Sequence, residues 1–193
     1  LIKRNLCFLN KSEETKFVAV SFIFITRFYK KSKLLISLWF MSDSLKNRFI
    51  YFCSPDSEED YFARTLIYIC ENNDEGSFGI ILNRSVEIRL KDFFSSANEE
   101  IEAKLNKEKI VIGGPVEPMT VYILHNKDSR FDELISINDH ISLSTDLNLV
   151  KSILEDDGPE NFLVSFGYTG WASGQLEREI LSGSWLITPS DKD

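Results

Sequence analysis

The sequence feature that most constrains the fold is a pair of short apolar runs joined by a turn. Residues 65–72 (TLIYICEN) and 77–84 (SFGIILNR) are rich in the residue types that favour strands. Between them lies NNDEG, at residues 72–76, and its Asn, Asp and Gly suit a tight turn. The pattern predicts a β-hairpin, and any fold of this chain has to contain it.

Other short apolar runs predict further strands, and the strands outnumber the helices. Besides the hairpin, the expected strands are residues 47–54, 109–115, 119–126, 134–137, 141–144, 161–168 and 184–189. Helices are expected within 88–109, within 144–158 and between Gly174 and Gly183. The two kinds of element alternate irregularly, which predicts an α+β fold rather than a doubly wound βαβ series.

The helix within residues 144–158 has start and stop signals of its own. Ser144 or Thr145 can cap its first turn, and Gly158 can end it. Its apolar stripe is expected to be Leu147, Val150 and Leu154. In the helix that ends at Gly183, Leu176 and Ile180 repeat at helical spacing.

The distribution of charge bears on which partners the chain can have. Residues 1–40 carry 8 basic and 2 acidic side chains, whereas residues 41–193 carry 14 basic and 28 acidic ones, a formal charge of −14. An acidic body repels nucleic acid and anionic membrane alike. We therefore expect no direct binding of nucleic acid by residues 41–193, although direct DNA binding is retained as a hypothesis to test.

Residues 1–40 differ from the rest of the chain. Their two apolar runs, of nine and eight residues, are shorter than the roughly 20 residues that span a bilayer, so no membrane span is expected. We expect an N-terminal extension outside the fold, followed from Met41 by a single domain over residues 41–193; a basic membrane-surface anchor is the alternative.

The three cysteines form no CxxC pair, so neither a disulfide framework nor a zinc site is expected. Free cysteines suit a reducing compartment, and we expect the protein to be cytoplasmic.

The glycine-rich stretch that begins at Gly167 is open to two interpretations. Gly167, Gly170 and Gly174 match neither the dinucleotide fingerprint nor a P-loop. A strand that leads into a helix N-terminus could bind an anion, but Glu177 in the first helical turn opposes a phosphate there. The structural interpretation is that the glycines allow unusual backbone angles or close packing under Trp171.

A set of residues that would specify a reaction is missing from the sequence. His125 and His140 are the only histidines, and neither belongs to an HExxH motif or a His/Cys cluster. His125 ends a strand pattern and is interpreted as a polar strand-end residue rather than a ligand or base. No metal and no cofactor are expected, and catalytic residues stay unknown.

Four segments carry a resemblance to a known family. They are FARTLIYICENNDEGSFGIILNRS (62–85), IGGPVEPMTVYILH (112–125), LSTDL (143–147) and FGYTGWASGQLEREILSGSWLITP (166–189). Together they closely resemble the YqgE/AlgH family, and the resemblance covers nearly all of residues 46–189. The chain departs from the family at Glu71-Asn72-Asn73 and at Asn83-Arg84-Ser85, and it ends soon after Trp185, so a truncated C-terminus is one interpretation.

The resemblance implies a fold and a class of function. The implied fold is one α+β domain whose split, bent, mixed sheet forms a pseudo-barrel with helices packed outside. Members are labelled as candidate transcriptional regulators, without a recognised DNA-binding motif, which implies a regulatory or accessory protein acting through a protein or small-molecule partner. The alternative is an enzyme of unknown class with a pocket around Tyr168, Gln175 and Glu177. The candidate ligand or partner surface comprises Asn83, Gly113, Gly114, Pro115, His125, Tyr168, Trp171, Gln175 and Glu177.

Overall fold

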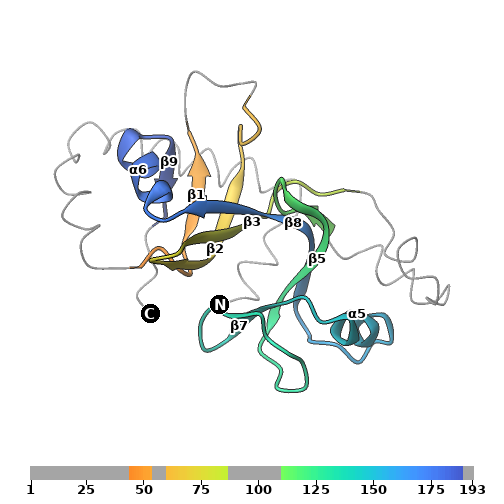
Figure 1. Cartoon of the computed structure of the whole chain (residues 1–193). Coiled ribbons are helices and arrows are strands. Elements are labelled where there is room, and N and C mark those ends of the chain that lie inside the picture. Colours follow the sequence, from red (N-terminus) through yellow and green to blue (C-terminus); the bar gives the residue numbers. More distant parts are fainter. Residues whose placement is uncertain (1–43, 54–59, 87–109, 189–193) are drawn as a thin grey trace. The chain divides into compact units, whose positions relative to one another are not determined.

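The structure is a computed structural model that describes residues 44–53, 60–86 and 110–188 (Figure 1). All of these except Ser44 belong to one compact unit, Leu45–Asp193. The expected helix within 88–109 and the extension at 1–40 lie outside the described residues. Within them, no helix is long and apolar enough to cross a membrane.

Strands dominate the described residues, as the sequence predicts. They are β1 (Phe49–Phe52), β2 (Leu66–Asn73), β3 (Gly76–Ile81), β4 (Ile110–Ile112), β5 (Val116–Asn126), β6 (Ile135–Ser136), β7 (Ile141–Ser144), β8 (Phe162–Ala172) and β9 (Trp185–Ile187). The helices are α5 (Leu147–Leu154) and α6 (Gln175–Ser182). The strand order is β6-β7-β5-β8-β3-β2-β1-β9, and β4 also pairs with β8. All pairs are antiparallel except β4 with β8, so the sheet is mixed.

The hairpin predicted from residues 65–84 is confirmed as β2 and β3. The pairing ends at Asn73 and Gly76, which lie opposite each other across the turn. Gly76 has a φ of +142°, and an added Cβ would lie 2.2 Å from the backbone oxygen of Trp171. The turn therefore needs glycine both for its backbone angle and for the close approach of β8.

Strand β8 is shared by the two halves of the sheet and bends between them (Figure 1). Its first part pairs with β4 up to Phe166 and with β5 up to Phe166 and again at Tyr168, and its last part pairs with β3, from Thr169 to Ala172. Gly167, just before this change of partner, has a φ of +68°. The strand expected over residues 161–168 therefore ends too early, since β8 continues to Ala172. The backbone groups of Thr169–Ala172 pair with β3, and this pairing overrides the turn preference of the glycines.

The sheet is split, bent and mixed, as expected, but it does not close. Strand β6 pairs only with β7, and β9 pairs only with β1, so they form the two ends of the strand path in the described residues. The expected pseudo-barrel is therefore not seen, because closure would require these two ends to meet. The broader expectation of an α+β fold is confirmed.

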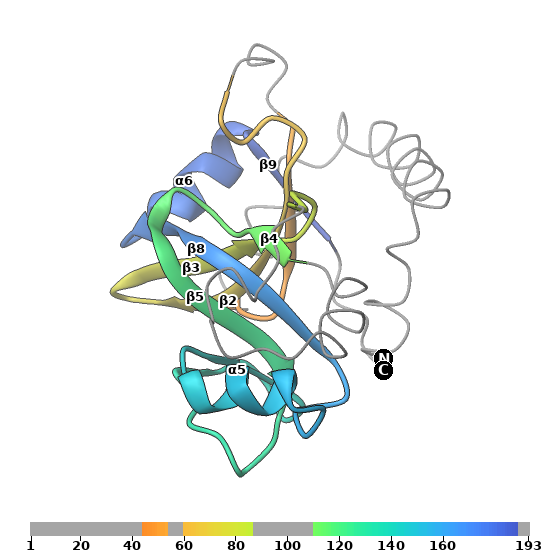
Figure 2. The same ribbon diagram turned by 90° about the vertical axis from the view of Figure 1, so that its right-hand side faces the viewer.

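Two apolar clusters lie on opposite faces of the half of the sheet that contains β5. The first combines side chains from both halves of the sheet: Tyr68, Cys70, Ile80, Leu82, Val111, Tyr122, Leu124, Ile137, Leu143 and Leu163. The second lies under α5 and includes Ile110, Ile123, Val164 and Phe166. Figure 2 shows α5 near the ends of β5 and β8.

Helix α5 confirms a predicted helix but corrects its details. Its N-cap is Asp146, whose carboxylate accepts a hydrogen bond from Asn148 N, rather than Ser144 or Thr145. Leu147 is 65% exposed because it is the first residue of the helix, ahead of the residues that pack on the sheet. It is therefore not part of the apolar stripe. The helix ends at Leu154, before Gly158 is reached. Its buried residues are Leu149, Val150, Ile153 and Leu154.

Replacement of Gly76 by alanine should weaken the fold by about 3 kcal/mol, because the new Cβ meets backbone rather than a side chain that can move. The measurement is the free energy of unfolding from urea titration. Glu75→Ala, at the exposed neighbouring position, is the control and should change stability by less than about 0.5 kcal/mol. Equal stability of both variants would contradict this account of the turn.

Candidate functional site

Gly113 and Gly114 lie where the end of β4 meets the middle of β8. Gly113 N donates to Phe166 O at 2.8 Å, and Gly113 O accepts from Ile81 N and Thr169 Oγ1. A Cβ added to Gly114 would lie 2.1 Å from Tyr168 O. These two glycines are therefore required for backbone packing between the halves of the sheet, while Pro115 beside them is exposed.

Tyr168 belongs to an aromatic cluster, which we define as Phe78, Tyr122 and Tyr168. The rings of Phe78 and Tyr168 are stacked with centroids 4.2 Å apart, and Tyr122 meets both edge-on. A Cβ at Gly170 would lie 3.1 Å from the ring of Tyr168, so the ring lies over that glycine. Tyr122 is buried, whereas Phe78 and Tyr168 are half-buried and reach the surface.

Glu117 extends the aromatic cluster with a carboxylate. Tyr122 Oη donates to Glu117 Oε2 at 2.7 Å. Burial of the phenol is the larger cause, and the hydrogen bond to Glu117 the next, of a raised pKa of Tyr122. The hydroxyl therefore stays protonated and remains a donor. Glu117 has a φ of +46°, in the left-handed region that side chains rarely adopt.

Trp171, Trp185 and Gln175 share one acceptor, the carboxylate of Glu179. Both indole Nε1 atoms donate to Glu179 Oε2, at 3.0 Å for Trp171 and 2.7 Å for Trp185. Gln175 Nε2 donates to Glu179 Oε1 at 2.9 Å, and Gln175 Oε1 accepts from Ala172 N. We call Trp171, Gln175, Glu179 and Trp185 the carboxylate anchor. It ties α6 to β8 and β9.

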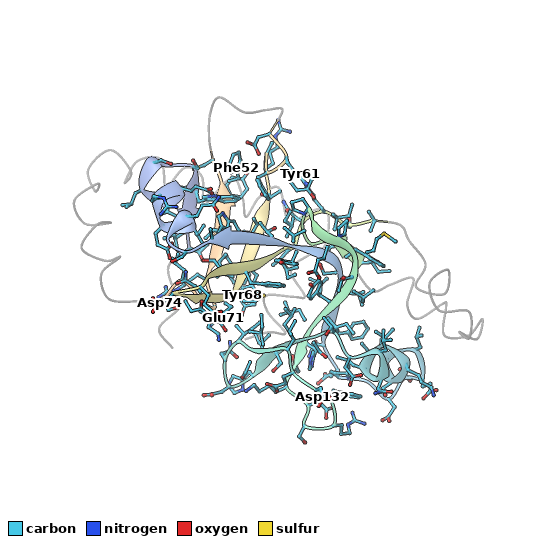
Figure 3. The ribbon with its side chains drawn as sticks, in the orientation of Figure 1. Phe52, Tyr61, Tyr68, Glu71, Asp74 and Asp132 are labelled. Atoms are coloured by element: carbon cyan, nitrogen blue, oxygen red, sulfur yellow. The ribbon has the colours of Figure 1, made fainter. Side chains whose placement is uncertain are left out.

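The tryptophans of the carboxylate anchor are buried, as the structural interpretation of the glycine stretch requires. Trp171 is 7% exposed and Trp185 is 2% exposed. Their rings meet edge-on with centroids 5.7 Å apart. Phe52 packs edge-on against Trp185, and Figure 3 shows it at the end of β1, where β1 pairs with β9.

Glu177 lies in the first turn of α6 and holds the helix to the hairpin. Its Oε1 accepts from Asn72 Nδ2 at 2.8 Å, and the same amide nitrogen donates to Ser77 Oγ. Gln175 bonds the backbone N–H of Ala172, and Glu177 bonds the side chain of Asn72 on β2. Their polar atoms serve the attachment of α6.

Asn83 and His125 lie apart from these groups. The side chain of Asn83, just after β3, accepts from Leu66 N and donates to Arg64 O, so it ties together the two chain segments at the open end of the hairpin. His125 is 2% exposed on β5, and its Nδ1 lies 2.7 Å from Asn126 O. Each side chain has a local structural partner.

The nine candidate residues therefore form several groups rather than one pocket wall. Tyr168 adjoins Gly113 and Gly114, while Trp171, Gln175 and Glu177 lie around α6.

Within residues 44–53, 60–86 and 110–188, no three His, Cys, Asp or Glu side chains are grouped to hold a metal ion. Burial raises the pKa of both described thiols, Cys53 and Cys70, which favours the unreactive protonated form.

Sequence reasoning missed four residues that the structure makes important: Glu179, Phe78, Tyr122 and Glu117. Glu179 had a detectable signal, since it follows Gln175 by one helical turn and two nearby tryptophans need acceptors. The link between Glu117 and Tyr122 had no such signal. It depends on an irregular part of β5, where residues 117–120 lie between the paired Val116 and Val121.

Comparison with known proteins places the chain among bacterial relatives. A family model described as AlgH-like matches residues 50–193. A UPF0301 protein of Thiobacillus denitrificans is 33% identical over 148 residues, which cover 77% of this chain and 80% of the relative. A UPF0301 protein of Neisseria meningitidis serogroup B is 30% identical over 149 residues, covering 77% and 81%.

Two solved structures share the fold. The solution structure of the AlgH protein from Pseudomonas aeruginosa superimposes with a TM-score of 0.64 at 30% identity, covering 77% of this chain and 78% of that one. The crystal structure of protein DIP2367 from Corynebacterium diphtheriae has a TM-score of 0.56 at 19% identity, covering 79% and 81%. The second likeness supports the fold alone.

Removal of the shared acceptor should destabilise the protein. Glu179→Ala leaves three donors without their partner and should cost about 2–4 kcal/mol in free energy of unfolding. Glu179→Gln keeps one acceptor oxygen and should cost about half as much. Arg178→Ala, at the exposed adjacent position, is the matched control and should change stability by less than about 0.5 kcal/mol. Similar losses in Glu179→Ala and Arg178→Ala, measured by urea titration, would show that the carboxylate anchor contributes nothing.

Proposed function

The chain belongs to the AlgH-like family, and from that premise we propose that it is a regulatory or accessory protein that acts by binding a protein partner rather than by catalysis or direct contact with DNA. The proposal concerns a cytoplasmic protein, since free thiols such as Cys53 and Cys70 suit a reducing compartment.

The observation that carries the proposal is how the polar side chains of the glycine-rich motif are used. Gln175 and Glu179 bond each other and their neighbours, and Glu177 bonds the hairpin. Acid–base catalysis needs a group that can reach a substrate and exchange a proton with it. Side chains already engaged in holding α6 to the sheet are better suited to shaping a surface than to chemistry.

A surface for a partner remains beside this scaffold. Phe78 and Tyr168 are half-buried aromatic residues next to the exposed segment that contains Glu117 and Met119, and Met119 is 79% exposed. Aromatic residues and Met are enriched at protein interfaces. Because these groups lie on the sheet rather than on α6, binding there leaves the carboxylate anchor undisturbed.

The charge favours a protein partner over DNA. Residues 41–193 carry a formal charge of −14, and DNA binding depends on basic side chains that neutralise phosphates. We expect duplex DNA to bind no more tightly than about 10 μM at ~0.15 M salt. Fluorescence anisotropy with a labelled duplex, titrated with salt, measures this. Sub-micromolar affinity that falls steeply with added salt would overturn the exclusion of DNA.

Contact with a protein can be tested in the cells of origin. A photo-crosslinking amino acid at Met119 should give discrete protein adducts, while the same amino acid at Leu147 on α5, which is 65% exposed, serves as the control. Adducts at Met119 that are missing at Leu147 are the expected result. Their absence at Met119, with the variant folded, would contradict the proposal.

A further inference from the structure

We propose that the aromatic cluster and Glu117 together bind an arginine side chain presented by a basic segment of a partner protein; the inference rests on the proposed function and names the chemistry of the partner. The cluster offers aromatic rings, and Glu117 offers a carboxylate that is bonded to the hydroxyl of one of them, Tyr122. A guanidinium group stacks on an aromatic ring and pairs with a carboxylate in the same plane.

The rings are held in place before any partner arrives. Phe78 and Tyr168 are stacked within 13° of parallel, and Tyr122 braces both from the buried side. Gly170 lets the ring of Tyr168 lie against the sheet, because a Cβ there would approach it to 3.1 Å. The half-buried pair therefore presents a preformed aromatic surface, so little side-chain freedom is lost on binding.

Glu117 is positioned by an irregular segment of β5. Between Val116, which pairs with Tyr168, and Val121, which pairs with Phe166, β5 contains four residues and β8 contains one. Insertions of this kind redirect side chains and are common next to functional sites. The backbone of Glu117 adopts the left-handed region at φ +46°, a conformation that costs energy and is kept only where the surroundings enforce it.

The carboxylate of Glu117 is held by one oxygen. Tyr122 Oη donates to Oε2, which fixes the direction of the group, and a carboxylate can accept further bonds through Oε1. Among the described residues, Glu71 also lies opposite Phe78, and its carboxylate already pairs with Lys46 Nζ at 2.7 Å. Glu117 is therefore the acidic group of the site.

Charge complementarity argues for a basic partner. The formal charge of −14 over residues 41–193 attracts a cationic segment and repels an acidic one. Arginine fits the site better than lysine does, because its planar guanidinium covers a ring and offers two parallel donors to a carboxylate. A lysine ammonium is a compact, strongly hydrated charge that makes neither contact as well.

The test uses the full chain and a fluorescein-labelled peptide in which arginine alternates with Gly-Ser, compared with the same peptide carrying lysine. Fluorescence anisotropy at ~0.15 M salt should show saturable binding of the arginine peptide, at least about threefold tighter than the lysine peptide. Equal affinity for the two peptides, or no saturable binding of either, would overturn the proposal.

Matched variants locate the binding. Glu117→Gln keeps the acceptor for Tyr122 and removes the charge, and it should weaken the arginine peptide by about fivefold or more. Asp139→Asn removes the same charge from an exposed turn and should change the affinity less than about twofold. Equal losses would mean that the peptide senses only the general acidic field, which would also overturn the proposal.

Substitutions at Tyr168 test the ring. Tyr168→Phe keeps the aromatic face and should bind within about twofold of the parent, whereas Tyr168→Leu should lose about fivefold. If circular dichroism shows that Tyr168→Leu does not fold, the comparison of Glu117→Gln with Asp139→Asn decides the question alone. Protein adducts at Met119 without any preference for the arginine peptide would refute this inference and leave the proposed function standing.

Discussion

The close backbone contact between Gly113–Gly114 and the middle of β8 is the constraint on which the other features depend. An added Cβ at Gly114 would lie 2.1 Å from Tyr168 O, so the two segments meet at a distance that only glycine permits. The contact fixes the point where β8 leaves one half of the sheet and enters the other. Because of it, Tyr168 faces Phe78 and Tyr122, while Trp171 a few residues later faces α6.

Local patterns predicted the parts of the fold that local forces determine. The hairpin of β2 and β3 follows from apolar runs around Asn, Asp and Gly, and α6 follows from Leu176 and Ile180 with Gly183 as its left-handed C-cap. The sequence predicts that the strand over residues 161–168 ends at residue 168, because glycines disfavour strands in isolation, whereas β8 extends to Ala172. Its pairing with β3 is a long-range interaction that no window of sequence contains.

The candidate site was predictable in its residue types but not in its partners. Tyr168, Trp171, Gln175 and Glu177 stood out as polar or aromatic residues among glycines, and all four have specific contacts. Which of them share a neighbour depends on how α6 folds back across β8 and β9. The carboxylate at Glu117 is therefore recognised only from the structure, and the sequence signal of Glu179 is limited to its spacing from Gln175 and the tryptophans nearby. The acidic charge, by contrast, needed only a count of side chains.

The shared carboxylate of Glu179 has a consequence for how the family can evolve. Two indoles and an amide depend on one acidic side chain, so the effects of changing any of the four residues are not independent. A lineage that lost the acid would gain little from keeping the second tryptophan, and one that lost a tryptophan would leave the acid underused. The four positions of the carboxylate anchor should therefore be inherited or replaced together, as a single unit of selection.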